Sequence, residues 1–159
     1  MELILVLAVI SVVLSVCAPM LRGFFLSRQT ADSAAVLLSL TKWARSEAIS
    51  QGRPCRLNID PREGTFWLTV QDAGRYVNLE TEMGRAFEVP EGSTIELKNP
   101  MPGAAATAQQ AAFVQFYPSG RSDVATIEIT GRDGEVYRLT CPAACEPFQL
   151  ILPTEEGAP

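Results

Sequence analysis

The sequence MELILVLAVISVVLSVCAPM occupies residues 1–20 and opens a long apolar run. From Leu3 to Leu21, nineteen consecutive residues carry no charge. As an α-helix this run is about 28 Å long, close to the thickness of the hydrocarbon core of a bilayer. The run therefore predicts a transmembrane helix within residues 1–23. Glu2 is the one charged residue ahead of it, and a carboxylate there is costly unless it reaches the interface or a partner.

Two other interpretations of this segment compete with a transmembrane helix. A cleaved secretory signal needs a basic residue ahead of a shorter apolar core, and no basic residue precedes the run. The tetrapeptide Leu14-Ser15-Val16-Cys17 is similar to a lipoprotein signal in which Cys17 is acylated, but Val16 is bulky for the position before the cut. The uncleaved helix explains the length of the run best.

The helical pattern continues beyond the apolar run. Apolar residues recur at mixed three- and four-residue intervals, which predicts an amphipathic helix with one face against a partner; they are Phe24, Ala31, Ala34, Ala35, Leu38, Ala48 and Ile49, with Trp43 nearby. We expect this stem helix to cover residues 24–53 and to continue the transmembrane segment.

The sequence also predicts where this long helix ends and bends. Gly52 is a probable C-cap, and Pro54 cannot donate the backbone hydrogen bond that would extend the helix. Pro19 and Gly23 lie near the middle of the combined helix. Proline removes a backbone donor and crowds the preceding turn, so these two residues predict a kink.

From residue 54 onward the apolar period changes from helical to alternating. Short runs rich in β-branched and aromatic residues are separated by turns that contain Gly, Pro and Asp; the runs are CRLNI, TFWLTV, RYVNL, STIEL, AAFVQFY, VATIEIT and VYRLT. Asp133-Gly134 predicts a tight hairpin between the last two. NPMPGAAATAQQ, residues 99–110, lacks the alternation and is predicted to be a loop. Residues 54–159 should form an antiparallel β head, a sheet or a sandwich, and the chain an α+β fold.

Composition excludes several classes of function. The head is acidic, with eight basic and fifteen acidic residues from residue 54 onward, which disfavours binding to a phosphate backbone. The chain has no histidine, which removes Ser-His, Cys-His and His-metal sites. No glycine-rich phosphate loop precedes a helix, and Asp60 and Asp133 lie in turns without the ligand series of a calcium loop. We expect no catalytic residue, no cofactor and no metal site.

Three of the four cysteines, Cys55, Cys141 and Cys145, lie in the head, and Cys17 lies in the apolar run. Cys141 and Cys145 fall between VYRLT and PFQLIL, two runs that could form a hairpin. A disulfide across that turn is the favoured pairing in an oxidising compartment. A bond from Cys55 to either is the main alternative, if the first strand lies beside the last ones. A three-cysteine zinc site would need a fourth ligand.

Three features of the chain resemble the type IV pilins and the pseudopilins of type II secretion. In that group a Glu follows shortly after a cleaved leader and a Pro lies seventeen residues later, as Glu2 and Pro19 do here. ARSEAISQGRPCRLNI, residues 44–59, resembles the helix end and first strand of the GspH/FimT minor pseudopilins. FYPSGRS, residues 116–122, resembles a late turn of their heads. Residues 60–112 carry no such resemblance.

This resemblance implies a structural subunit rather than an enzyme. Its partners would be other pilin or pseudopilin subunits and an inner-membrane assembly platform, in a type II secretion system that transports proteins or in a type IV pilus. Glu2 would set the register of the subunit by pairing with the N-terminal amine of a neighbour, because an uncompensated buried carboxylate costs several kcal/mol. The chain would cross the inner membrane once, with its head in the periplasm.

The resemblance also concerns processing. Such proteins are made with a short basic leader that ends in Gly and is followed by Phe, and this sequence shows neither. We therefore expect a mature chain that begins three residues before Met1, after cleavage by prepilin peptidase and methylation of that Phe.

Two alternative functions remain open from the sequence. One is a DNA-binding minor pilin for DNA uptake, in which Arg121, Arg132 and Arg138 would cluster near the C-terminal turns. The other is a lipid-anchored periplasmic protein with a β-sandwich head, attached through Cys17.

Overall fold

The computed structural model describes residues 2–101, 103–105 and 111–153, with the backbone alone for residues 2–5, 8, 14 and 16–27. Within these residues one long helix, α1 (Glu2–Gln51), precedes a β-rich head. The head contains the short 3₁₀ helix η1 (Glu82–Gly84) and the strands β1 (Cys55–Asp60), β2 (Thr65–Asp72), β3 (Arg75–Asn78), β4 (Phe87–Glu88), β5 (Thr94–Lys98), β6 (Ala112–Phe116), β7 (Ala125–Thr130), β8 (Val136–Cys141) and β9 (Gln149–Ile151).

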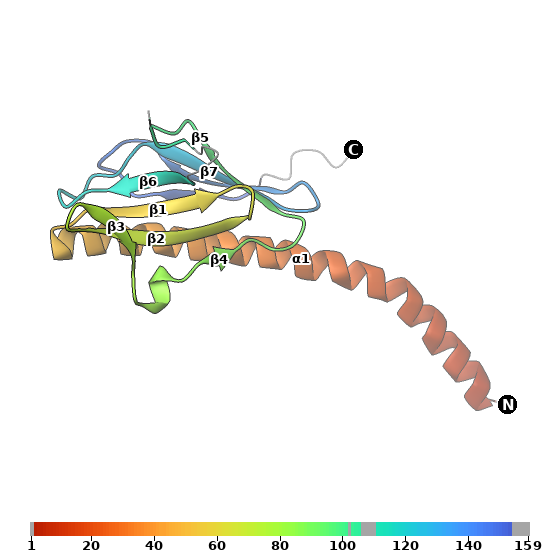
Figure 1. The fold of residues 1–159 in the computed structure, drawn as a ribbon. Helices are drawn as coiled ribbons and strands as arrows, with labels where there is room; N and C mark the ends of the chain where they lie inside the picture. The colour runs from red at the N-terminus through yellow and green to blue at the C-terminus, as the bar shows by residue number, and fades with distance from the viewer. Residues whose placement is uncertain (1, 102, 106–110, 154–159) are drawn as a thin grey trace.

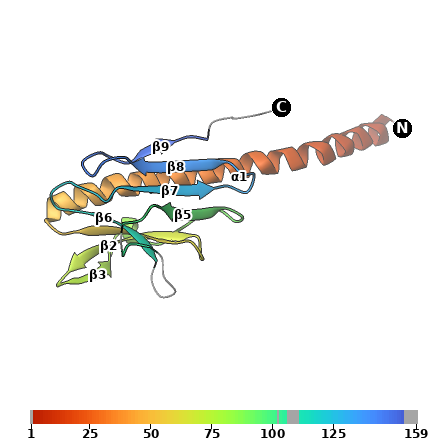
Figure 2. The same ribbon diagram turned by 90° about the horizontal axis from the view of Figure 1, so that it is seen from above.

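The strands form two antiparallel sheets. Sheet A has the order β3-β2-β1-β6, and β4 also pairs with β2; sheet B has the order β5-β7-β8-β9. The C-terminal half of α1 packs against strands of both sheets, while its N-terminal half projects beyond the head and curves away (Figure 1). Seen from above, sheet B lies over the C-terminal half of the helix, and sheet A lies beside sheet B (Figure 2). The predicted α+β fold with antiparallel sheets is confirmed.

The core of the head lies where α1 meets the sheets. The helix contributes Ala34, Leu37, Leu40, Ala44 and Ala48, each 0% exposed. Their three- and four-residue spacing places them along one side of the helix. β1, β6 and β7 each alternate a buried residue with a more exposed one, because successive side chains point to opposite faces of a sheet. The buried set packs on the helix and the other set faces solvent.

The helix face predicted from the sequence is right only in part. Ala34 and Ala48 are buried as predicted, but Ala35 is exposed and Ile49 is 53% exposed. Leu40, which the prediction omitted, is fully buried. Where apolar residues are frequent, three- and four-residue intervals fit more than one face of a helix, and the position of the sheets decides which face is covered.

The strand predictions are confirmed in the head. Each alternating run in the sequence coincides with a strand, and β7 and β8 form the hairpin expected at Asp133-Gly134. Gly134 has a φ of 85° in that turn, a conformation that glycine adopts without strain. The short elements η1 and β4 were not predicted. The predicted loop 99–110 connects β5 to β6, and its residues 102 and 106–110 lie outside the described part of the chain.

The helix ends as expected, and its membrane segment stays a prediction. Gly52 has a φ of 63°, the left-handed conformation of a C-terminal cap, and Pro54 follows it. The structure describes the backbone alone at Pro19 and Gly23, and the kink assigned to these residues stays a prediction. Among the residues that could be searched, no helical segment meets the length and hydropathy needed to cross a membrane.

The shared core predicts a large effect of truncating Leu40. We expect Leu40→Ala to lower the free energy of unfolding by about 2–5 kcal/mol, because it leaves a cavity between the helix and the sheets. Ile49→Ala, an equal truncation at an exposed site of the same helix, should cost less than about 1 kcal/mol. Urea unfolding followed by tryptophan fluorescence measures both. Equal losses would show that the buried face has been assigned wrongly.

Candidate functional site

The sequence-predicted residues of α1 cannot be placed in detail. Glu2, Cys17, Pro19 and Gly23 lie in the parts of α1 where the structure describes the backbone alone. The proposed register role of Glu2 and the acylation of Cys17 therefore remain predictions. The polar clusters that the structure describes lie in the head, on the sides of the two sheets that face away from α1.

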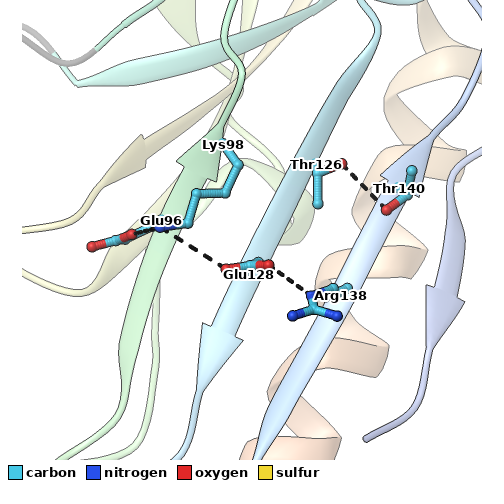
Figure 3. Close-up of polar contacts among 6 residues, drawn as sticks. All are labelled: Glu96, Lys98, Thr126, Glu128, Arg138 and Thr140. Carbon is cyan, nitrogen blue, oxygen red and sulfur yellow. Dashed lines mark hydrogen bonds and ion pairs between the residues drawn. The ribbon is translucent and has the colours of Figure 1, made fainter.

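The outer face of sheet B carries a row of paired charges (Figure 3). Glu128 on β7 accepts a hydrogen bond from Nε of Arg138 on β8 at 2.7 Å, and its other carboxylate oxygen lies 3.9 Å from Nζ of Lys98 on β5. Lys98 also pairs with Glu96, and this hydrogen bond raises the pKa of the Lys98 ammonium. Two positive and two negative side chains thus neutralise one another, as in a solvated ladder of surface ion pairs.

The outer face of sheet A carries a different arrangement, which we call the Arg56 cluster: Arg56, Tyr76, Phe113 and Gln115. The guanidinium carbon of Arg56 lies 3.6 Å from the centre of the Tyr76 ring and 4.0 Å from that of Phe113. Arg56 Nε and the Tyr76 hydroxyl both donate to Oε1 of Gln115, at 3.0 and 3.1 Å. Both ring faces attract the cation, so the guanidinium is held in one orientation.

A hollow of about 410 Å³ lies beside β6, next to this cluster; we call it the Tyr117 hollow. The turn after β6 forms much of it, and single residues from the loop after β5 and the loop after β8 complete it; its lining is Met101, Tyr117, Ser119, Arg121, Ser122, Asp123, Val124 and Ala144. Met101, Val124 and Tyr117 are 48%, 44% and 37% exposed, large values for apolar side chains. The FYPSGRS motif noted in the sequence therefore forms one wall of an open, partly apolar hollow.

Asp123 connects the hollow to the Arg56 cluster. One carboxylate oxygen accepts the Tyr117 hydroxyl at 3.1 Å, and the other accepts the backbone N–H of Gln115 at 3.0 Å. Burial and the negative charge of Asp123 raise the pKa of the Tyr117 hydroxyl, and Arg56 opposes that shift. Both oxygens of Asp123 are thus used to fix the turn against β6.

The three head cysteines are free thiols in the structure. Cys55 and Cys141 are buried and Cys145 is exposed. Burial, with the nearby Glu47 carboxylate, raises the pKa of Cys55 to about 11. β1 lies between β2 and β6 in sheet A, and β8 and β9 belong to sheet B, so the first strand is not hydrogen-bonded to the last ones; the pairing of Cys55 with Cys141 or Cys145 stays a prediction. The β8–β9 hairpin is confirmed, and the Cys141–Cys145 bond stays a prediction.

The arginines considered for DNA binding do not form one patch. Arg138 pairs with Glu128, and Arg121 lines the Tyr117 hollow. Arg132 lies in the turn after β7, where its side chain packs near Gly92. The six residues of β7 separate the turn of Arg121 from that of Arg132, a distance of about 20 Å along a strand.

Sequence reasoning missed the Arg56 cluster, although a signal for it exists. Arg56, Phe113 and Gln115 occupy the non-buried positions of alternating runs, which should face solvent. An aromatic side chain on that side of a strand can stack on a cation from a neighbouring strand. Which of these positions become neighbours depends on the pairing of β1 with β6, and alternation does not give that pairing.

Comparison with known proteins identifies the class and then the family. A long N-terminal helix, half packed on an antiparallel β head and half free, defines the pilin-like class of subunits. The chain belongs to the GspH family, because the family model described as Type II transport protein GspH matches residues 33–142. A search of curated protein sequences finds no significant match.

Solved structures support the same fold. The minor pseudopilin EpsH of the Vibrio cholerae type 2 secretion system is 18% identical, with a TM-score of 0.65 over 80% of this chain and 99% of that one. Escherichia coli GspH is 19% identical, with a TM-score of 0.58 over 82% and 91%. The type IV minor pilin FimU of Pseudomonas aeruginosa is 21% identical, with a TM-score of 0.52 over 85% and 96%. The chain is thus a pilin-like structural subunit.

Burial of the head cysteines predicts their relative reactivity. In the reduced, folded protein at pH 8, we expect iodoacetamide to alkylate Cys145 at least about tenfold faster than Cys55. The thiolate is the reactive form, and the raised pKa of Cys55 keeps its thiol protonated at this pH. Mass spectrometry of the digested protein measures both rates, and unfolding in urea should abolish the difference. Equal rates in the folded state would contradict the burial of Cys55.

Proposed function

We propose that the chain is a minor pseudopilin of a type II secretion system, anchored in the inner membrane by residues 1–23 with its head in the periplasm. The observation that carries this proposal is the exposed apolar surface on the free half of α1, where six described side chains are 47–63% exposed: Val6, Leu7, Val9, Ile10, Val12 and Val13. Such a surface is unfavourable in water. Lipid before assembly, and neighbouring helices after it, would cover it.

In this proposal the free half of α1 builds the shaft of a filament. Apolar helices drawn from a membrane associate through close packing and lipid release. A carboxylate buried in such a bundle must be paired with a positive charge. Glu2 would therefore favour the one register in which the N-terminal amine of a neighbouring subunit lies level with it along the filament axis. The head would then remain outside the shaft and present its outer faces to other subunits, to secretion components or to cargo.

A disulfide between Cys141 and Cys145 is part of the same proposal. An oxidising periplasm permits it, and the loop that it would close already contacts the helix, because Arg45 Nη2 donates to the carbonyl of Cys145 at 2.7 Å. Alkylation of the protein from intact cells without reductant should leave both cysteines unmodified. Full labelling of Cys145 under those conditions would exclude the bond.

The register role of Glu2 gives the central test. We expect Glu2→Leu to lower the amount of the subunit in isolated filaments at least about tenfold, because the variant loses the paired charge that fixes its height. The amount in the membrane fraction should not fall, since the apolar run becomes longer. Immunoblots of filament and membrane fractions measure both quantities.

Ser15→Leu is the matched control, because it adds the same side chain further along the same helix. It should enter filaments at the wild-type level. Glu2→Leu at the wild-type level in filaments would exclude the register role, and a soluble periplasmic protein would exclude the membrane anchor. Deleting the assembly platform of the type II system or of the type IV pilus, one at a time, shows which of the two the subunit requires.

A further inference from the structure

The basic side chains on the outer faces of the two sheets differ in whether they pair with carboxylates. On sheet B, Lys98 and Arg138 are paired with carboxylates across neighbouring strands (Figure 3). On sheet A and the turn after β6, Arg56 and Arg121 form no ion pair with any carboxylate of the described residues. The head is acidic as a whole, and these two cations lie on neighbouring parts of one surface without a paired carboxylate in the part of the chain that the structure describes.

Arg56 is already held in the geometry that anion binding needs. Two aromatic rings cover the faces of its guanidinium, and the hydrogen bond to Gln115 uses Nε alone. The planar fork of a guanidinium binds a carboxylate through two parallel hydrogen bonds. Because packing has already fixed the side chain, little conformational entropy would be lost on binding.

The Tyr117 hollow supplies an apolar site beside this cation. Met101 and Val124 are half-exposed at its edge, and Arg121 lines the same hollow. The hydrogen bonds from Gln115 to Asp123 and from Tyr117 to Asp123 join the hollow to the Arg56 cluster. Asp123 is the one carboxylate in this surface, and both of its oxygens already accept hydrogen bonds. Tyrosine and arginine around an apolar hollow are the composition typical of interface hot spots.

We propose that the Arg56 cluster and the Tyr117 hollow together dock an acidic segment of another pilin-like subunit, in which an aspartate or glutamate neighbours an apolar side chain. The apolar side chain enters the hollow between Met101 and Val124, and the carboxylate pairs with Arg56 or Arg121. This inference rests on the proposed assembly function and adds to it the surface and the chemistry of the partner.

A protein segment fits this surface better than a nucleic acid does. Two arginines can neutralise one or two carboxylates, whereas a phosphate backbone needs an extended basic track. The fifteen acidic residues of the head would repel such a backbone, and Arg132 and Arg138 lie elsewhere.

Photocrosslinking in the native membrane tests the proposal with the full chain. The photoreactive residue p-benzoylphenylalanine replaces Val124 at the edge of the hollow, or Ile151 on β9 as a control of similar exposure, 44% against 50%. The chain is coexpressed with the other pilin-like subunits of its system. We expect Val124 to crosslink to one of these subunits, within a peptide that contains Asp or Glu beside an apolar residue. Ile151 should not give this product.

Charge variants then test the arginines. Arg121→Gln should lower the yield of the crosslink about tenfold, the factor expected for one charge-assisted hydrogen bond. Arg132→Gln removes the same charge from another exposed turn and should leave the yield unchanged. Arg56→Lys keeps the charge but loses the two-bond fork, so its yield should lie between wild type and Arg121→Gln.

Three results would overturn the inference. They are Arg121→Gln and Arg56→Lys yields that both equal wild type, a crosslinked peptide without an acidic residue, and binding of a short fluorescent DNA duplex at physiological salt that Arg121→Gln abolishes. The filament fractions of the Glu2 experiment separate this inference from the proposed function. A subunit that enters filaments without the Val124 crosslink contradicts the docking surface alone, and a subunit absent from filaments contradicts the assembly function.

Discussion

Burial of one face of α1 against both sheets is the interaction on which the rest of the structure depends. Both sheets pack on this helix, and Leu37 and Leu40 belong to the same buried core as residues of both sheets. Three alanines on the same face let the strands approach the helix closely. The C-terminal half of α1 is held in the head by these contacts, and its N-terminal half projects beyond the head and curves away.

The outer faces of the sheets are among the surfaces of the head that remain open to contacts with other molecules. The outer face of sheet B carries a ladder of paired charges. Such pairs are stable in water and would contribute little binding energy to a partner protein. Sheet A instead stacks an arginine between two rings beside an open hollow. The difference lies in the side chains and not in the fold, since both faces are antiparallel strands packed on the same helix.

The position of the FYPSGRS turn after β6 is set by contacts with other parts of the head. Pro118 and Gly120 shape the turn, and the φ of Gly120 is 79°. Its position depends on contacts from elsewhere, since Ser122 N donates to the carbonyl of Ala144 and Asp123 pairs with the backbone of Gln115. The motif provides the bend, and residues of the loops after β5 and β8 complete the hollow.

The sequence by itself determined the class of the fold, because helical and alternating periods depend on local geometry. It predicted the helix end at Gly52, the alternating strands and the hairpin at Asp133-Gly134, and its resemblance to the GspH group agrees with the family match. Only the tertiary structure decided which face of α1 is buried and which strands are neighbours. It placed β1 and β8 in different sheets and brought Arg56 beside Phe113, because strand pairing joins residues distant in sequence and the alternating period does not indicate which strands pair.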